Sequence, residues 1–306
     1  MLVTIVGATG FLGKNLTAYI LRNTDYSVRA FSRSAPSLPF GSSRVEKTAG
    51  SIFEPADVHA ALQDADAAIY LFHMMGSQER DFAEGEASAA QSFAYTARQA
   101  GLQKLVFFGG LGDDADPKLS KHLASRHATG KILHDNLPEC QVLELRASMV
   151  LSDGSVGFDI IRSMADKLPV IIIPTWAVTP TQPIMLDDAL QYIVAGLELP
   201  SDIPSQVIEI GGPEQLTYRD IATRYARQTA KQRRWNRVQP VITMPLVPRN
   251  AAIWWLERFV SPKSAGIGGP MVDSLRNEMT IHTQTAGQLF PDIRPRKISF
   301  DGLASD

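Results

Sequence analysis

The chain has 306 residues, 44% of them hydrophobic and 20% charged, which is the balance of a folded protein with a core of ordinary size. Its 30 basic and 32 acidic residues leave a net charge of −2, so nothing favours nucleic acid as a partner. Cys140 is the only cysteine, which excludes an intrachain disulfide and a cysteine metal site, and the six histidines lack ligand spacing, so we expect no metal.

The sequence carries no targeting signal that we recognise. It opens on the strand-like run MLVTIVG, without a basic segment or a cleavage site before it. No run of about 18 apolar residues occurs, so we expect no segment to span a membrane and a cytoplasmic location. The short apolar run at 251–260 (AAIWWLERFV) predicts a helix packed in the core or against a lobe, with a membrane-surface contact as the alternative.

Short β-rich runs alternate with helical patterns through the first half of the chain. This alternation predicts βαβ units and a parallel sheet. We expect an α/β fold, a Rossmann-type doubly wound sheet whose ligand crevice lies at the carboxyl ends of the strands. The expected strands cover residues 2–7, 27–33, 44–50, 67–72, 104–110 and 141–148, and the expected helices cover 13–22, 56–63, 80–100 and 119–136.

The alternation weakens after about residue 150. Residues 156–173 predict a helix followed by a buried strand, and residues 180–200 predict an extended entry to a helix that begins with acidic residues. Residues 207–228 predict a strand, a glycine turn and a helix with Thr217 as its N-cap. We therefore expect a Rossmann domain over 1–150, rejoined by 184–212, and a smaller C-terminal lobe from 151–183 and 213–306.

Three glycines lie between the first expected strand and helix, in the segment TIVGATGFLGKNL. Gly7, Gly10 and Gly13 have the spacing G-x-x-G-x-x-G. Glycines at such a turn allow the backbone to approach a pyrophosphate, which the N-terminus of the following helix attracts. A glycine triplet alone is a weak signal, but its place after the first strand of a βα-alternating chain favours a dinucleotide site over a turn without a ligand.

The end of the second expected strand indicates which dinucleotide. An acid at this point binds the free 2′-hydroxyl of NAD, whereas an arginine accommodates the 2′-phosphate of NADP. The sequence there is SVRAFSRS, with Ser32 and Arg33 at the tip and no acid. A guanidinium forms paired charge-assisted bonds to phosphate, so we expect NADP(H) rather than NAD(H). The alternative is an ordinary exposed arginine at a strand end.

With these residues in place, the chain resembles atypical short-chain dehydrogenase/reductases, the NmrA-like or NAD(P)H-binding group that is also called nucleoside-diphosphate-sugar epimerase-like. The resemblance covers roughly residues 1–225. It rests on the segments GATGFLGKNL, VRAFSRS, DADAAIYLFHMMG, FAYTARQAGLQKLVFFGGLGDD, LELRASMV, PTQPIMLDDAL and IEIGGPEQLTYRDI, which occur in family order.

The resemblance implies further cofactor contacts beyond the glycines. Residues at the diphosphate would be Thr9, Phe11 and Leu12; those at adenine would be Ser51 and Ile52; those along the ribose and nicotinamide would be Leu71, Phe72, His73, Ala147 and Ser148. Many relatives carry an aspartate at the position of Ser51, so the contact to the adenine amine would be weaker here.

The family mechanism uses a tyrosine as proton donor, a lysine four residues later that holds the nicotinamide ribose, and a serine after the fifth strand. In the segment SRHATGKIL, Lys131 fits the lysine, but His127 stands at the tyrosine position. Gly109 and Gly110 occupy the serine region and offer no side chain. His127 could still pass a proton, because imidazole titrates near neutral pH, or it could be a hydrogen-bonded helix residue without a catalytic role.

These features leave three functions open. The first is an NADP-dependent reductase with His127 and Lys131 as catalytic residues, acting on a small apolar carbonyl compound, enone or quinone. The second is a non-catalytic regulator that senses NADP(H) through a protein partner. The third is an accessory or assembly protein, which only the Trp254–Trp255 segment suggests.

Overall fold

The computed structural model describes residues 1–74, 82–230, 238–245, 247–260 and 268–301. Its centre is a parallel sheet of seven strands in the order β11-β6-β5-β4-β1-β2-β3. The strands are β1 (Leu2–Val6), β2 (Ser27–Ser32), β3 (Val45–Ala49), β4 (Ala67–Tyr70), β5 (Lys104–Gly110), β6 (Gln141–Ala147) and β11 (Gln206–Ile210).

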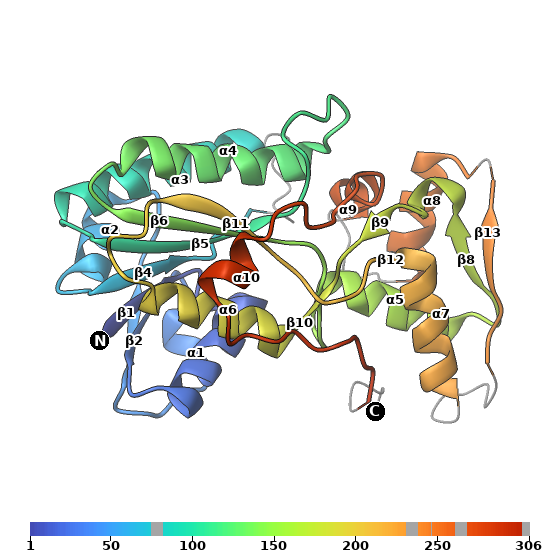
Figure 1. The fold of residues 1–306 in the computed structure, drawn as a ribbon, viewed down its shortest axis with the longest axis horizontal. Helices are drawn as coiled ribbons and strands as arrows, with labels where there is room; N and C mark the ends of the chain where they lie inside the picture. Colours follow the sequence, from blue (N-terminus) through green and yellow to red (C-terminus); the bar gives the residue numbers. More distant parts are fainter. Residues whose placement is uncertain (75–81, 231–237, 246, 261–267, 302–306) are drawn as a thin grey trace.

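Helices cover both faces of this sheet, as expected for a doubly wound fold (Figure 1). One face carries α1 (Phe11–Asn23), α6 (Leu186–Glu198) and α10 (Thr285–Leu289), and the other carries α2 (Pro55–Leu62), α3 (Phe82–Gln99) and α4 (Lys121–Asn136). Strands β4, β5 and β6 are buried over almost their whole length because helices lie on both sides of them. The Rossmann-type α/β fold is thereby confirmed.

The order of the strands reverses at the centre of the sheet. From β1 the chain proceeds to β2 and β3 on one side, whereas from β4 it proceeds to β5, β6 and β11 on the other. Connections that leave neighbouring strands in opposite directions open a crevice at the carboxyl ends of these strands. The loops after β1 and β4 therefore meet at the place where a doubly wound fold binds its ligand.

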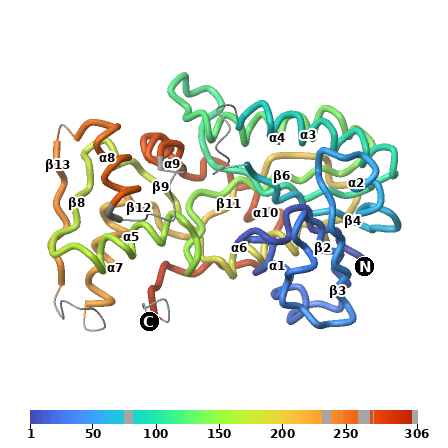
Figure 2. Tube along the Cα trace, turned by 180° about the vertical axis from the view of Figure 1, so that it is seen from behind, coloured from blue at the N-terminus to red at the C-terminus, as the bar shows by residue number. Residues whose placement is uncertain are grey.

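A second body of structure lies beyond the carboxyl ends of the strands (Figures 1 and 2). It has its own hydrophobic cluster, centred on Phe158, Tyr225 and Phe300. Its larger elements are α5 (Val156–Lys167), β8 (Ile171–Pro174), α7 (Tyr218–Gln228), β13 (Val241–Met244), α8 (Arg249–Trp255), a π-helix (Leu256–Val260) and α9 (Gly268–Ser274). Four short strands form two separate two-stranded sheets: β7 (Val150–Leu151) pairs with β10 (Ile184–Met185), and β9 (Pro180–Thr181) pairs with β12 (Leu216–Thr217).

The chain crosses between the two bodies more often than the expected division allows. Residues 184–212 supply α6 and β11 to the sheet. Part of 213–306, expected in the lobe, also lies on the sheet, because Ala286, Phe290 and Ile293 pack into the cluster under α1 and α6. These apolar residues belong to α10 and the segment after it. They pack beside β11, the edge strand of the sheet (Figure 1).

Most element boundaries agree with the sequence to within three residues. Thr217 caps α7 as predicted, since its hydroxyl accepts from the Asp220 N–H while the Asp220 carboxylate accepts from the Thr217 N–H. The predicted helix at 251–260 begins as α8, whose residues contribute to the wall of a large cavity. Among the described residues, no helix is long and apolar enough to cross a membrane.

Candidate functional site

The loop between β1 and α1 has a shape that only glycine permits. Gly7 has φ +89°, and a Cβ there would lie 3.1 Å from the carbonyl carbon of Leu71 in the loop after β4. A Cβ on Gly13 would lie 2.6 Å from the Gly7 oxygen, closer than real side chains come. The backbone of the loop is thus held tightly against the start of α1, whose N-terminal N–H groups form the anion cradle expected for a pyrophosphate.

The ends of β2 and β3 lie side by side at one end of this crevice, with Ser32 opposite Ala49 in the register. Arg33 is exposed there and makes no hydrogen bond or ion pair with the rest of the described chain. Ser51 donates its N–H to the Asp57 carboxylate at 2.8 Å, and Ile52 is buried. The residues expected near the adenosine are therefore brought together, and Arg33 is available to a ligand.

A single cavity of about 780 Å³ extends from the glycine loop to the C-terminal lobe. At the sheet end its wall includes most of the predicted cofactor residues: Gly7, Gly10, Phe11, Leu12, Gly13, Leu71, His73, Ala147 and Ser148. At the lobe end the wall is apolar and aromatic: Met149, Ile160, Met164, Trp176, Met244, Trp254, Trp255, Val272 and Met279. Thr9 and Phe72 do not line it, nor do the residues expected near the adenosine: Ser32, Arg33, Ser51 and Ile52. The carbonyl of Phe72 instead accepts from Arg126 at 3.0 Å.

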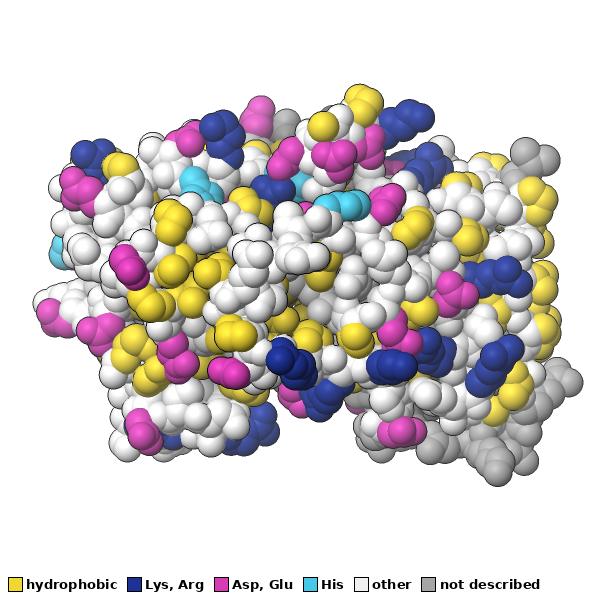
Figure 3. All heavy atoms as spheres, in the orientation of Figure 1, with side chains coloured by type: hydrophobic (Ala, Val, Ile, Leu, Met, Phe, Trp, Pro, Cys, Tyr) yellow, Lys and Arg dark blue, Asp and Glu magenta, His cyan; other side chains and the backbone are white. Residues whose placement is uncertain are grey.

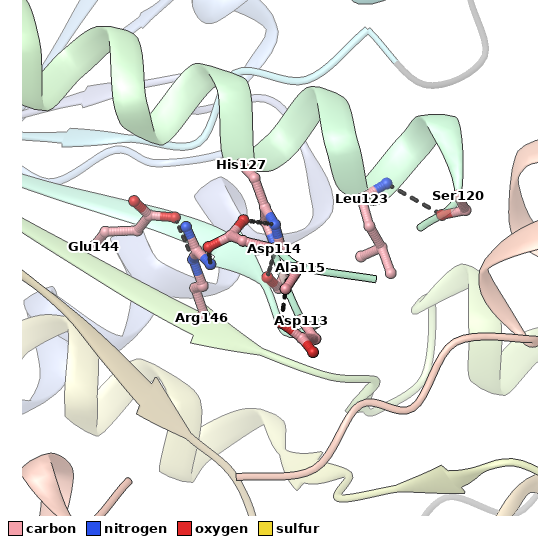
Figure 4. Close-up of polar contacts among 9 residues, drawn as sticks. Asp113, Asp114, Ala115, Ser120, Leu123, His127, Glu144 and Arg146 are labelled. Carbon is pink, nitrogen blue, oxygen red and sulfur yellow. Dashed lines mark hydrogen bonds and ion pairs between the residues drawn. The ribbon is translucent and has the colours of Figure 1, made fainter. Parts of the chain in front are cut away.

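His127 lies beneath the loop that follows β5 and not in the cavity (Figure 4). Its Nε2 is 2.9 Å from the carbonyl oxygen of Gly110, and its Nδ1 is 2.5 Å from the Asp114 carboxylate. The ring is 6% exposed. Burial is the main reason why the pKa of His127 is lowered. In this position the imidazole connects α4 to the end of β5, which is the arrangement of a structural hydrogen-bonded histidine.

Lys131 lies away from the position expected for it beside the nicotinamide ribose. Its side chain is 75% exposed and forms an ion pair with Asp135 one helical turn later, at 2.7 Å. It is not among the residues that line the cavity. The structure therefore does not bring Lys131 to the nicotinamide end of the site, where the resemblance placed it.

A different pair of α4 residues faces the cavity. His122 and Arg126 have the same i, i+4 spacing but lie five residues earlier, in the segment HLASR. The guanidinium of Arg126 is fully committed, because it donates to the carbonyls of Phe72 and Phe108 and lies 4.7 Å from the centre of the Phe107 ring. Sequence reasoning missed this pair, although its spacing was visible, because Lys131 matched the family motif better.

His73 and Glu86 form a polar pair at the edge of the same cavity. Glu86, on α3, is buried, and its Oε1 accepts from His73 Nδ1 and, at 2.9 Å, from the N–H of Met74. Its other oxygen accepts from the Ser125 hydroxyl of α4 at 2.5 Å. Three donors from two elements therefore hold one carboxylate. Sequence reasoning assigned His73 to the cofactor but did not identify Glu86.

The pKa values of this cluster follow from burial and from the carboxylate. Burial alone would raise the pKa of Glu86, but the hydrogen bond and charge of His73, the charge of Arg126 and the Ser125 hydroxyl outweigh it and hold that pKa at about 2. Burial lowers the pKa of His73, and it lowers the pKa of His122 to about 3. At neutral pH the site therefore contains a carboxylate, two neutral imidazoles and the Arg126 cation.

The serine region remains without a side chain. A Cβ on Gly110 would lie 2.8 Å from Leu123 Cδ2, so a serine would require the Leu123 side chain to shift. The Ser148 hydroxyl, after β6, is buried without a partner among the described residues and lines the cavity. An unpartnered buried hydroxyl of this kind is a candidate to meet a ligand at that end.

A second hollow, lined by residues of α1 and α6 together with Arg294 and Arg296, contains none of the glycine-loop residues. No group of three or more His, Cys, Asp or Glu residues in the described chain is arranged to hold a metal ion. Basic and acidic side chains are intermixed over the face shown in Figure 3. The cavity at the sheet switch point is therefore the candidate site.

The comparisons with known proteins agree with this geometry. Residues 7–144 match the NAD(P)H-binding family. This match agrees with the expected resemblance to the NAD(P)H-binding group, and it ends within β6. No curated protein matches the sequence.

Solved structures share the fold at low sequence identity. A nucleoside-diphosphate-sugar epimerase from Staphylococcus aureus superposes with a TM-score of 0.73 and 14% identity, over 97% of this chain and 98% of that one. The triphenylmethane reductase of Citrobacter sp., complexed with NADP(H), gives 0.69 and 14% over 96% and 97%. UDP-glucuronic acid 4-epimerase from Bacillus cereus, complexed with NAD, gives 0.64 and 18% over 91% and 97%. These likenesses extend the fold assignment to nearly the whole chain.

Proposed function

We propose that this chain, whose residues 7–144 match the NAD(P)H-binding family, is an NADP(H)-dependent reductase that acts on a small apolar carbonyl compound, enone or quinone. One observation supports this proposal above the others. The cavity joins the glycine loop to an apolar wall that includes Trp176, Trp255 and Met279. A site that holds a nucleotide at one end and excludes water at the other suits hydride transfer to an apolar substrate.

The cradle fits a dinucleotide. Gly7 and Gly13 leave no room for a Cβ, so the backbone of this loop would meet the diphosphate, with the N-terminus of α1 behind it. Leu71, Ala147 and Ser148 would border the nicotinamide end. The cofactor supplies the hydride when it is bound. The roles expected for His127 and Lys131 are not part of this proposal, because neither side chain lines the cavity.

The preference for NADP(H) rests on Arg33. It stands at the carboxyl end of β2, exposed and without a partner in the described chain, where a 2′-phosphate would lie. The end of β2 carries no acidic residue that would instead bind the free 2′-hydroxyl of the NAD ribose. The complex of Citrobacter triphenylmethane reductase with NADP(H) has the same fold, which is compatible with this choice.

Substitution of Arg33 tests the nucleotide preference. We expect Arg33→Ala to weaken NADPH binding by about tenfold or more, because a charge-assisted bond to phosphate is lost, and to leave NADH binding unchanged. The measurement is a fluorescence titration of both nucleotides. Arg98→Ala, an exposed arginine on α3, is the matched control. Equal weakening of NADH and NADPH binding would contradict the role of Arg33.

Turnover decides between the reductase and the two other functions. We expect the protein to oxidise NADPH in the presence of at least one member of a panel of apolar quinones, enones and aromatic aldehydes. Tight NADPH binding without any turnover across that panel would contradict the reductase and favour a sensing regulator or an accessory protein with a protein partner. A change of oligomeric state on NADPH binding, measured by sedimentation, would favour the sensing regulator. An unchanged oligomeric state would favour the accessory protein.

A further inference from the structure

The pair formed by His73 and Glu86 has no counterpart among the residues that the family mechanism uses. His73 lines the cavity immediately after β4, beside the glycine loop, and Glu86 holds it from behind. We propose that His73 is the catalytic acid–base residue of this site, with Nε2 as the atom that exchanges the proton, and that Glu86 positions it. This proposal rests on the proposed reductase function, which supplies the reaction.

The hydrogen bonds of Glu86 decide which nitrogen of His73 is available. The carboxylate is ionised and accepts on both oxygens, so it requires a donor from His73, and that donor is Nδ1–H. In the neutral ring Nε2 must then carry the lone pair. Nε2 is buried and has no partner within the described chain. A buried polar atom in this state is normally satisfied by a ligand or a water molecule, and here it belongs to a residue of the cavity wall.

The other two histidines of the region are less suited to this role. His122 lies next to His73, with ring centroids 4.9 Å apart, but no carboxylate among the described residues forms a hydrogen bond or ion pair with its ring. His127 has a carboxylate partner, Asp114, but both its nitrogens are engaged outside the cavity. Only His73 combines a carboxylate on one nitrogen, an unpartnered second nitrogen and a place in the cavity wall. A carboxylate behind an imidazole holds its tautomer and stabilises the imidazolium that forms.

With a carbonyl substrate, the proposed reaction is a two-electron reduction to an alcohol. The hydride adds to the carbonyl carbon, the π pair of the C=O bond moves to oxygen, and this oxygen takes the proton from Nε2 of the His73 imidazolium. The substrate is reduced to an alcohol, NADPH is oxidised to NADP⁺, and one proton is consumed. Neutral His73 keeps its Nδ1–H on Glu86 and regains a proton at Nε2 from water.

The charged groups that face His73 determine the pH response. They are Glu86 from α3, and His122 and Arg126 from α4. Burial and the Arg126 charge lower the pKa of His73, and Glu86 opposes them. The reduction requires the imidazolium, so kcat/KM falls as pH rises through that lowered pKa. Without the Glu86 charge the same decline moves to lower pH.

The first test needs no turnover. In ¹⁵N-histidine NMR spectra of the ligand-free protein at neutral pH, we expect His73 in the Nδ1–H tautomer, with Nε2 unprotonated. In Glu86→Gln we expect the pKa of His73 to fall below its wild-type value. An Nε2–H tautomer in the wild type, or an unchanged pKa in Glu86→Gln, would overturn the proposal.

The second test uses NADPH oxidation on a substrate that the wild type reduces. We expect His73→Gln, at saturating NADPH, to lower kcat by about 10²- to 10⁴-fold, the usual size of an acid–base contribution. His59→Gln, an exposed histidine on α2, is the matched control and should retain wild-type kcat. Glu86→Gln should shift the pH profile to lower pH, a change that a purely structural role would not produce.

The possible failure modes are distinguishable. If His73→Gln leaves an unpaired buried carboxylate and fails to fold, the double variant His73→Gln/Glu86→Gln removes that charge, and the same loss of kcat is expected from it. Wild-type kcat in a folded His73 variant would overturn the role of His73 and leave the reductase intact. A wild type that binds NADPH but reduces nothing would overturn both.

Discussion

Gly130 shows how a single residue controls the packing of α4. It lies in the middle of the helix, and a Cβ there would overlap the carboxylate of Glu144 on β6. Glu144 is fully buried, and its other oxygen accepts from Arg146 Nε at 2.7 Å. The glycine therefore allows the helix to lie directly over a buried ion pair, which Asp114 extends toward His127 (Figure 4). Glycine is unfavourable inside a helix, but it is required at position 130 because any side chain there would overlap Glu144.

The change Gly130→Ala tests this packing. Although alanine is the better helix former, we expect the variant to lose about 1–3 kcal/mol of unfolding free energy, because the added methyl group displaces Glu144 or the helix. Urea denaturation measures the loss. Gly287→Ala in α10 is the matched control, since a Cβ there would meet nothing within 4 Å, and it should be neutral or stabilising. Equal behaviour of the two variants would contradict the argument.

At the level of elements, the ends of helices were predictable where a local hydrogen bond defines them. The reciprocal bonds of Thr217 and Asp220 start α7, and the hydroxyl of Ser120 accepts from Leu123 at the start of α4. The strands of the sheet were predictable because β-branched runs alternate with helical patterns. What did not follow from local pattern was the return of α10 to the sheet, since five helical residues carry no signal of their partner.

The cap of α7 provides a test at this level. Thr217→Ala removes the acceptor of the Asp220 N–H, and we expect a loss of about 1 kcal/mol of unfolding free energy. Thr223→Ala, on the exposed side of the same helix, is the control, since its hydroxyl only returns to the carbonyl of Arg219. A difference of less than a few tenths of a kcal/mol between the variants would argue that tertiary contacts alone position α7.

On the scale of the whole molecule, the buried cluster of His73, Glu86, His122 and Arg126 links α3, α4 and the loop after β4. This cluster makes the free energy of unfolding depend on pH. The pKa of Glu86 is held at about 2, so its stabilising contribution is complete above its ordinary value of 4.5 and is lost as pH falls toward 2. Burial lowers the pKa of His122 to about 3, so protonation opposes folding below about pH 6.5. Both effects have the same sign.

We therefore expect the urea midpoint to fall as pH is lowered from 6.5 to 3, measured by circular dichroism at constant ionic strength. In Glu86→Gln the part of this decline below pH 4.5 should be smaller, because the carboxylate that must be protonated is absent. A midpoint that does not change over this range would show that the cluster is solvated in the folded protein.

The sequence by itself determined the fold class, the glycine loop and the place of Arg33, because each depends on short-range features: alternation, turn geometry and position at a strand end. The tertiary structure decided which face of α4 meets the cavity. Five residues turn a helix by about 140°, so the pair His122 and Arg126 faces a different way from His127 and Lys131. That rotation is set by contacts from other elements, Glu144 under Gly130 and Gly110 against His127, which no local pattern reveals.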